Sequence, residues 1–282
     1  MKIGIIGVGF VGGTTAKVFE KAHEVTLYDR YKGPHTDPSR LKEAEVVFIC
    51  VPTPMKPSGG IDHSAIYHSV QALIDATSDL DEKPLVAIRS TAVSGTTDSL
   101  EKEYPPFHFV FNPEFLREKH AFEDMINMNR IVIGANRDED YRKVEEVYKP
   151  LFPEAEYLHV DNKTAEMIKY ASNVMLTGQI AIANEIYQVC NAVGVNYDTV
   201  KNALLMDSRI ARNIDVPGHD GDFGFGGKCL PKDLNALIYL ARENGYRPHL
   251  LEEIWRLNEK VRKNKDWMDI PGATSENNNF HA

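Results

Sequence analysis

No stretch of the sequence approaches the roughly 20 consecutive apolar residues that are needed to span a bilayer. The apolar N-terminal stretch is interrupted by Gly4, Gly7 and Gly9, and it does not end in a cleavage site of the kind that follows a secretory signal. These absences predict a cytoplasmic protein without a membrane partner.

Cysteine is also scarce, because the chain holds only Cys50, Cys190 and Cys229. The three are far apart and odd in number, and neither a Cys-x-x-Cys pair nor a neighbouring pair of histidines accompanies them. The pattern indicates neither a disulfide framework nor a zinc site, so we expect no metal.

Positive charge is in deficit, since the formal net charge is −9. A general nucleic-acid surface is therefore not expected, and any anionic ligand must be held by local donors. The length of 282 residues exceeds what one hydrophobic core usually organises, which predicts two domains.

The N-terminus has the order strand, glycine loop, helix. Residues 2–6 read as a buried parallel strand, Gly7-Val-Gly-Phe-Val-Gly12 follows, and a helical pattern continues to Ala22. In such a loop Gly7 makes the tight turn, Gly9 lets backbone approach a pyrophosphate and Gly12 lets the helix pack closely.

A second strand, residues 24–28, ends in Asp29, about 20 positions after the loop, where a carboxylate can accept from ribose hydroxyls. The combination predicts a dinucleotide site. Asp29 favours NAD over NADP, although Arg30 beside it leaves some room for a 2′-phosphate.

Strands and helices then alternate, with short buried strands at residues 44–51, 84–89, 107–111 and 130–134. We therefore predict an α/β fold with a Rossmann-type, doubly wound parallel sheet over residues 1–160. Ligands of such sheets lie at the carboxyl ends of the strands, so the segments just past each strand are candidates for function.

Two strand exits are distinctive. Pro52-Thr-Pro54 makes a rigid loop or an ordinary strand exit. Thr91, in the segment Ser90 to Thr96, can donate a hydroxyl toward a nicotinamide or a reacting water, or it can act as a helix cap.

A third exit, Asn112-Pro113-Glu114, has the pattern of a helix N-terminus, with Asn112 as cap and Pro113 at the first helical position. Glu114 and Glu118 would then share one face, where they can position a water or accept a sugar hydroxyl. The alternative is a solvated first turn, where the helix dipole favours acidic residues.

The longest helical pattern covers residues 163–193 and predicts a helix that bridges the two domains. Lys169 and Asn173, four apart, share a face and can hydrogen-bond a developing oxyanion, or they are surface polar groups. We expect a helical domain over residues 161–268 with a last helix from about His249 to Trp267, and a disordered tail over residues 269–282.

The segment Gly224-Phe-Gly-Gly-Lys-Cys-Leu-Pro-Lys-Asp233 places Cys229 between glycines and Pro231, which is favoured in the first turn of a helix. A helix N-terminus with Lys228 and Lys232 nearby favours the thiolate and nucleophilic attack on a carbonyl. The alternative is a buried cysteine after a glycine turn.

These segments, from residue 1 to about 265, together resemble the UDP-glucose/GDP-mannose dehydrogenase family, which oxidises a nucleotide sugar at C6 to the uronic acid with two NAD. The resemblance rests on the glycine loop, Val51-Pro-Thr-Pro54, Ser90-Thr91, Asn112-Pro-Glu-Phe-Leu-Arg-Glu118, the helix of Lys169 and Asn173, and the cysteine segment. It implies an NAD-dependent oxidoreductase acting on CH–OH, with UDP-glucose the first choice of substrate.

The resemblance also implies the roles of individual residues. Cys229 is the covalent nucleophile and Lys169 the oxyanion partner, while Asp233 and Asn173 assist a catalytic water that Thr91 and Glu118 position beside Glu114. Arg209 reaches the neighbouring subunit's site, which implies a homodimer through the helical domain. The cofactor set is Gly7, Gly9, Phe10, Val11, Gly12, Asp29, Arg30, Val51, Pro52, Thr53, Ser90, Thr91, Glu118 and Lys232. The substrate set is Glu114, Phe115, Leu116, Lys169, Asn173, Arg209, Phe223, Gly224, Phe225, Gly226 and Cys229.

The chain departs from the family in stopping before the third domain, which in other members holds the nucleotide and much of the diphosphate; its absence is expected to cost substrate-binding energy. Two other readings stay open. One is a two-domain β-hydroxyacid dehydrogenase, which uses a lysine but needs no cysteine. The other is a non-catalytic paralogue that binds NAD and dimerises.

Overall fold

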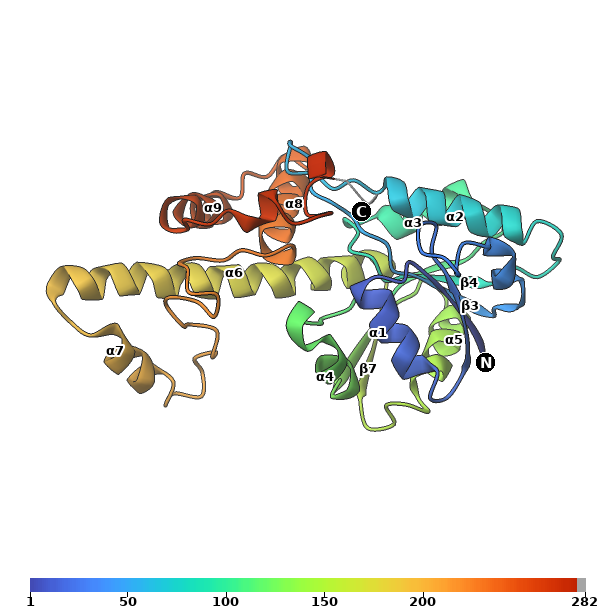
Figure 1. Cartoon of the computed structure of the whole chain (residues 1–282), viewed down its shortest axis with the longest axis horizontal. Coiled ribbons are helices and arrows are strands. Elements are labelled where there is room, and N and C mark those ends of the chain that lie inside the picture. Colours follow the sequence, from blue (N-terminus) through green and yellow to red (C-terminus); the bar gives the residue numbers. More distant parts are fainter. Residues whose placement is uncertain (278–282) are drawn as a thin grey trace. The chain divides into compact units, whose positions relative to one another are not determined.

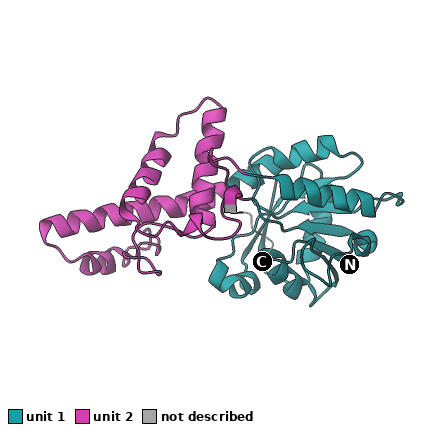
Figure 2. Cartoon of the chain, turned by 45° about the horizontal axis from the view of Figure 1, so that its top comes forward, with its two compact units in different colours: residues 1–53, 62–169, 281 teal, residues 54–61, 170–280, 282 magenta. Residues whose placement is uncertain are grey.

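The computed structural model describes residues 1–277, which form two compact units (Figures 1 and 2). Of the described residues, unit 1, teal in Figure 2, comprises 1–53 and 62–169, and unit 2, magenta, comprises 54–61 and 170–277. The boundary thus falls near Lys169, within a helix, and not at residue 160. Residues 54–61, which follow the third strand, join the second unit, which sequence analysis did not predict.

Unit 1 is built on one seven-stranded sheet. Its strands are β1 (Lys2–Ile6), β2 (Glu24–Tyr28), β3 (Val46–Ile49), β4 (Leu85–Ile88), β5 (Phe109–Phe111), β6 (Arg130–Gly134) and β7 (Glu156–Val160). Their order in space is β2-β1-β3-β4-β5-β6-β7, and every neighbouring pair is parallel except β5 and β6. The predicted Rossmann-type fold is confirmed, with a mostly parallel sheet.

Two features of the sheet differ from the prediction. β6 runs antiparallel to β5, with Phe111 opposite Gly134. β7 was not predicted, because it lies at the edge of the sheet and its side chains are largely exposed, which leaves no buried apolar run to read.

Helices cover both faces of this sheet (Figure 1). They are α1 (Phe10–Phe19), α2 (Ser64–Ala76), α3 (Thr96–Glu103), α4 (Ala121–Ile126) and α5 (Asp138–Tyr148), with short 3₁₀ turns η1 (Pro38–Glu43) and η2 (Glu118–His120). One buried cluster packs α1, α4 and α5 against Leu85 and Ala87 of β4. The other packs α2 and α3 against Val86 and Ile88 of the same strand, so the central strands are apolar on both faces.

Unit 2 is helical. The long helix α6 (Asn162–Val193) begins in unit 1 and continues into unit 2, and it is followed by α7 (Tyr197–Leu204), α8 (Cys229–Glu243), α9 (His249–Val261), η3 (Asp266–Met268) and η4 (Ser275–Asn277). Val174 and Ala181 of α6 pack with Leu234 and Ile238 of α8 and with Ile254 of α9. α9 ends earlier than predicted, because Arg262 already has extended backbone, with φ −80° and ψ 128°.

The predicted disorder of the tail is wrong for residues 269–277. Ala273 is 1% exposed, its carbonyl accepts from the Met55 N–H at 2.9 Å, and the Ser275 N–H donates to the Met55 carbonyl at 2.8 Å. The tail is ordered because residues 54–61 give it a backbone partner that cannot be read from its own composition. Residues 278–282 lie outside the described residues. In the part of the chain that the structure describes, no helix is both long and apolar enough to cross a membrane.

Candidate functional site

The glycine loop between β1 and α1 leaves room for a ligand at one position only. Gly7 has φ +91°, and a Cβ there would lie 2.6 Å from the Cys50 carbonyl oxygen. A Cβ at Gly12 would collide with the Gly7 carbonyl. A Cβ at Gly9 would meet nothing within 4 Å. The first and third glycines are therefore required by the chain itself, and the second leaves the open backbone that a pyrophosphate needs.

Asp29, just after β2, braces this loop. Its Oδ2 accepts from the Val8 N–H at 2.8 Å and its Oδ1 from the Tyr31 N–H at 3.0 Å. Lys32, which sequence analysis did not select, donates to the Val8 carbonyl at 2.7 Å. The remaining lone pairs of the Asp29 carboxylate can accept from ribose hydroxyls. Arg30 is exposed, with its guanidinium 5.8 Å from the Tyr31 ring.

Further residues of the predicted cofactor set lie at the start of α1 and at the exits of β3 and β4. Phe10 and Val11 form the first turn of α1. The Ser90 hydroxyl accepts from the Val51 N–H at 2.8 Å and donates to the Val51 carbonyl at 2.7 Å. Ser90 therefore fixes the backbone that leads into Pro52 and Thr53, while Thr91 after it is half-buried.

The predicted helix start at Asn112 is wrong, since no helix begins at Pro113. The Asn112 side chain is buried and serves long-range partners instead of capping. Its Oδ1 accepts from Arg89 at 2.7 Å and from the Tyr148 hydroxyl at 2.5 Å, and its Nδ2 donates to the Val132 carbonyl at 2.9 Å. Consequently Glu114 and Glu118 do not share a helix face: Glu114 is buried, whereas Glu118 is exposed in η2.

Glu114 instead forms a buried ion pair with Lys169 of α6. The Lys169 Nζ donates to the Glu114 carboxylate at 2.8 Å and to its backbone carbonyl at 2.5 Å. The second carboxylate oxygen accepts from the Leu116 N–H at 2.7 Å, and the Phe115 ring lies 5.6 Å from the Nζ. Burial alone would raise the pKa of Glu114, but the charge and hydrogen bond of Lys169 and the Leu116 N–H outweigh it, so the pKa is lowered. The carboxylate is therefore ionised at neutral pH.

In unit 2, Cys229 is the first residue of α8 and is exposed, whereas Cys50 and Cys190 are buried. This confirms the predicted position of the sulfur at a helix N-terminus. Lys232 and Asp233 form a buried ion pair of 2.6 Å one turn further on. Lys232, assigned to the cofactor by the resemblance, thus binds a carboxylate of its own helix.

Asp233, which is fully buried, has a second partner: its other oxygen accepts from the Asn173 side chain at 2.5 Å. Asn173 follows Lys169 by four residues on α6. The structure therefore joins Asn173, Asp233 and Lys232 in one network in unit 2 and Glu114 with Lys169 in unit 1.

Two of the glycines before Cys229 are required by the packing of the chain itself. A Cβ at Gly224 would collide with the Asn258 side chain, and one at Gly226 with the guanidinium of Arg262. Sequence analysis missed Asn258 and Arg262. The signal for Asn258 is that a polar residue interrupts the buried face of α9, whereas Arg262 lies just after that helix.

Two other predicted substrate residues are less enclosed. Arg209 is 87% exposed at its side chain and is paired with Asp207 at 2.6 Å. Phe223 is half-buried, with its ring centroid 5.3 Å from that of Tyr187.

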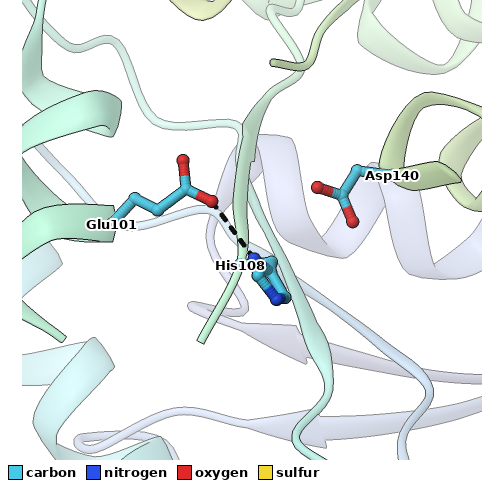
Figure 3. Close-up of side chains that lie close together, drawn as sticks. All are labelled: Glu101, His108 and Asp140. Carbon is cyan, nitrogen blue, oxygen red and sulfur yellow. Dashed lines mark hydrogen bonds and ion pairs between the residues drawn. The ribbon is translucent and has the colours of Figure 1, made fainter. Parts of the chain in front are cut away.

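One group among the described residues has the spacing of metal ligands: Glu101, His108 and Asp140 (Figure 3). Its ligand atoms already have partners. The Glu101 carboxylate pairs with His108 Nδ1 at 3.2 Å, and Arg137 donates to His108 Nε2 at 2.7 Å and to Asp140 at 2.6 and 2.8 Å. The Arg137 guanidinium supplies the positive charge that a metal ion would bring.

A glycine loop with one open position, an acidic residue after β2 and a lysine on the helix after the sheet define a dinucleotide-dependent oxidoreductase with a helical second unit. Comparisons with known proteins identify its family. The NAD-binding-domain model of the UDP-glucose/GDP-mannose dehydrogenase family matches residues 30–152, and the central-domain model of that family matches residues 163–260. The chain belongs to this family, and NAD is its cofactor.

Individual relatives agree. The UDP-glucose 6-dehydrogenase AglM of Haloferax volcanii is 31% identical over 303 residues, which cover 92% of this chain and 70% of AglM. TuaD, a UDP-glucose 6-dehydrogenase of Bacillus subtilis, is 33% identical, with 80% of this chain and 48% of TuaD covered. The structure of a UDP-glucose dehydrogenase from Pyrobaculum islandicum has a TM-score of 0.81 at 29% identity and covers 92% of this chain and 68% of its own. The chain thus spans from about half to about two thirds of these relatives.

Proposed function

We propose that the chain oxidises a nucleotide sugar, UDP-glucose first, at C6 to the uronic acid in a four-electron reaction through Cys229. The observation that carries the proposal is the cysteine itself. It is exposed at the N-terminus of a 15-residue helix, where the helix dipole favours a thiolate, whereas the other cysteines are buried. The choice of UDP-glucose is supported by the relatives, which are UDP-glucose 6-dehydrogenases.

The proposed reaction balances in four stages. The C6 alcohol loses a hydride and a proton and becomes an aldehyde. The Cys229 thiolate then forms a C–S bond to the aldehyde carbon, and the alkoxide takes a proton to give a thiohemiacetal. Loss of a second hydride and proton gives a thioester, and water cleaves the C–S bond to release the carboxylate and the thiol. NAD accepts the hydride at each oxidation, so two NAD and one water are consumed per sugar.

The chain's own residues would hold charge and protons during these stages. The ammonium group of Lys169, oriented by Glu114 at 2.8 Å, would stabilise the negative oxygen of each tetrahedral species. Asp233, held by Asn173 and Lys232, would orient the hydrolytic water, with Thr91 and Glu118 as further positioning groups.

The test is the Cys229→Ala variant with NAD and UDP-glucose. Cys190→Ala serves as the control, because the side chain of Cys190, on α6, is buried in a hydrophobic cluster. We expect Cys229→Ala to form no uronic acid and Cys190→Ala to form it. Mass spectrometry of the wild-type chain should detect a sugar acyl group on Cys229.

Two other outcomes of this experiment would support the alternative functions. Uronic acid from Cys229→Ala at the wild-type rate would exclude the thioester route and favour a lysine-based dehydrogenase of the β-hydroxyacid type. A wild-type chain that binds NAD but oxidises no nucleotide sugar would be a non-catalytic paralogue.

We also propose that the chain forms a homodimer through α6. Met175, Ile182 and Val189, seven residues apart, are 66%, 63% and 55% exposed and form an apolar stripe with the spacing that pairs helices. A second copy would cover this stripe, and the exposed Arg209 would be offered to the partner's site.

Light scattering should give twice the chain mass for the wild type and the single mass for Ile182→Asp. Tyr246→Asp, at an exposed position after α8, should stay dimeric; a monomeric wild type at micromolar concentration would contradict the proposal.

A further inference from the structure

We propose that Asn258, Arg262 and Asp266, here called the loop clamp, are positioning residues that fix the backbone leading into Cys229. The inference deepens the proposed function, because it rests on Cys229 as the nucleophile. All three residues lie at or just after the end of α9, and they act on residues 223–227, which precede the start of α8.

The loop is held by side chains. Asn258 accepts from the Phe225 N–H at 2.7 Å and donates to the Phe225 carbonyl at 3.0 Å, so its amide satisfies both backbone groups of one residue as a neighbouring strand would. The Gly224 N–H donates to Asn184 of α6 at 3.0 Å. Asp266 accepts from the Gly227 N–H at 3.1 Å, two residues before the sulfur.

Arg262 forms the hydrogen bonds and ion pairs that connect these residues. Its side chain is 1% exposed, and its Nη2 donates to Asp220 at 2.7 Å and lies 3.2 Å from Asp266. Its Nε donates to the Asn264 carbonyl at 2.7 Å. Burial raises the pKa of Asp220, but hydrogen bonds from Arg262 and from the Asp222 N–H more than offset it, and the pKa is lowered. A buried guanidinium between two carboxylates is thus the centre of the clamp.

Two of the three glycines in the loop pack directly against the clamp. Gly224 has φ +67°, and any side chain there would collide with Asn258. A side chain at Gly226 would collide with both Arg262 and Asp266. Gly227, in contrast, has open space at its Cβ position. The close approach that Gly224 and Gly226 permit is therefore an approach to the clamp.

Removing the guanidinium would leave Asp220 and Asp266 as neighbouring carboxylates without their shared cation, and Asp266 would no longer be held against the Gly227 N–H. The start of α8 would then move relative to its support. A displacement of about 1 Å at a nucleophile can cost about 100-fold in rate. The loss is expected in kcat, because the clamp contacts the backbone that leads into the nucleophile.

The experiment compares Arg262→Ala and Arg262→Lys with Arg256→Ala, which changes an exposed arginine of α9 that is paired with Glu253. We expect kcat to fall about 100-fold in Arg262→Ala, with KM for UDP-glucose and NAD within about threefold. Arg262→Lys should recover part of the rate, and Arg256→Ala should match the wild type. Circular dichroism establishes that each variant is folded; if Arg262→Ala is not, Asn258→Asp, which loses the donor to Phe225, takes its place.

A second readout needs no substrate. Alkylation of Cys229 by iodoacetamide, followed against pH by peptide mass spectrometry, should shift to higher pH in Arg262→Ala because the sulfur leaves its fixed position at the helix N-terminus. Gly226→Ala should slow catalysis in the wild type and should have a smaller effect in the Arg262→Ala background, where the collision with the guanidinium is removed and the collision with Asp266 remains. A wild-type kcat and an unchanged alkylation profile in Arg262→Ala would overturn the clamp. If Cys229 proves dispensable for turnover, the alkylation profile still decides whether the clamp positions the loop, so the two failures are distinguishable.

Discussion

Glu114 and Lys169 bury opposite charges, with side chains 8% and 5% exposed. Ion pairs in such surroundings add little net stability, because desolvation offsets the attraction, but removal of one partner leaves an uncompensated charge. A large gain in stability is therefore not expected from the pair, whereas a fixed ammonium group is what the proposed role of Lys169 requires.

Glu114→Gln should lower the free energy of unfolding by about 3 kcal/mol, because it leaves the buried ammonium of Lys169 without its carboxylate. Glu118→Gln, four residues on and exposed, should change it by less than about 0.5 kcal/mol. Urea denaturation of both variants at pH 7.5 measures the difference. Equal stability of the two variants would contradict the ion pair.

At the scale of residues, the sequence indicated candidate catalytic residues but not the side chains that contact and orient them. Glu114 and Lys169 were selected separately, and neither was predicted to pair with the other. Asn112 was read as a helix cap because a local pattern was the only information. Its actual partners, Arg89 and Tyr148, are 23 and 36 residues away.

The glycine loop offers a matched pair of substitutions in one element. Gly12→Ala should abolish NAD binding, because its Cβ would collide with the Gly7 carbonyl, which is backbone and cannot move aside. Gly13→Ala, the next residue of α1, has open space at its Cβ and should stabilise the helix by about 0.5–1 kcal/mol. NAD titration by calorimetry and thermal denaturation separate the two. Retained NAD affinity in Gly12→Ala would contradict the observed packing.

The start of helix α3 donates hydrogen bonds to a buried carboxylate. Glu166 of α6 is fully buried and accepts from the Gly95 and Thr97 N–H groups and the Thr97 hydroxyl. Burial raises the pKa of Glu166 to about 7, although these hydrogen bonds lower it. The folded state therefore binds a proton more tightly than the unfolded state, in which the pKa is 4.5.

The stability contributed by protonated Glu166 is complete below pH 4.5 and is lost as the pH rises to about 7. The loss is on the order of 3 kcal/mol. In Glu166→Gln this pH dependence should be absent, although the variant can differ from the wild type by a constant free energy of unfolding. Urea denaturation midpoints of both proteins between pH 4.5 and 8 measure the pH dependence. Parallel pH profiles for wild type and variant would contradict the raised pKa.

At the scale of elements, the strands of the first half were predictable from their short apolar runs, and the long helix α6 was predictable from its apolar period. The direction of β6 was not, since a strand has the same pattern in either direction. The end of α9 was placed too late because Trp267, in η3, is buried and continues the apolar pattern beyond the helix.

For the whole molecule, NAD at 100 times its Kd should raise the free energy of unfolding by about 2.7 kcal/mol. NADP at the same concentration should raise it less, because its 2′-phosphate would meet the carboxylate of Asp29. Thermal denaturation with each nucleotide measures both effects. A larger shift with NADP would instead favour Arg30 as the residue that determines cofactor choice.

The division into two units and the order of the motifs could be read from the sequence. The membership of residues 54–61 in unit 2 could not, because it depends on pairing of Met55 with Thr274, 219 positions later in the chain. The loop clamp could not be predicted for the same reason, because Arg262 packs against Gly226, which lies 36 residues earlier in the chain.

In the proposed reaction, one cysteine carries a nucleotide sugar through two successive oxidations. The most direct measurement incubates the purified chain with NAD and limiting UDP-glucose and counts NADH per sugar consumed. We expect two NADH and one uronic acid per sugar. One NADH per sugar with an aldehyde as the final product would contradict it.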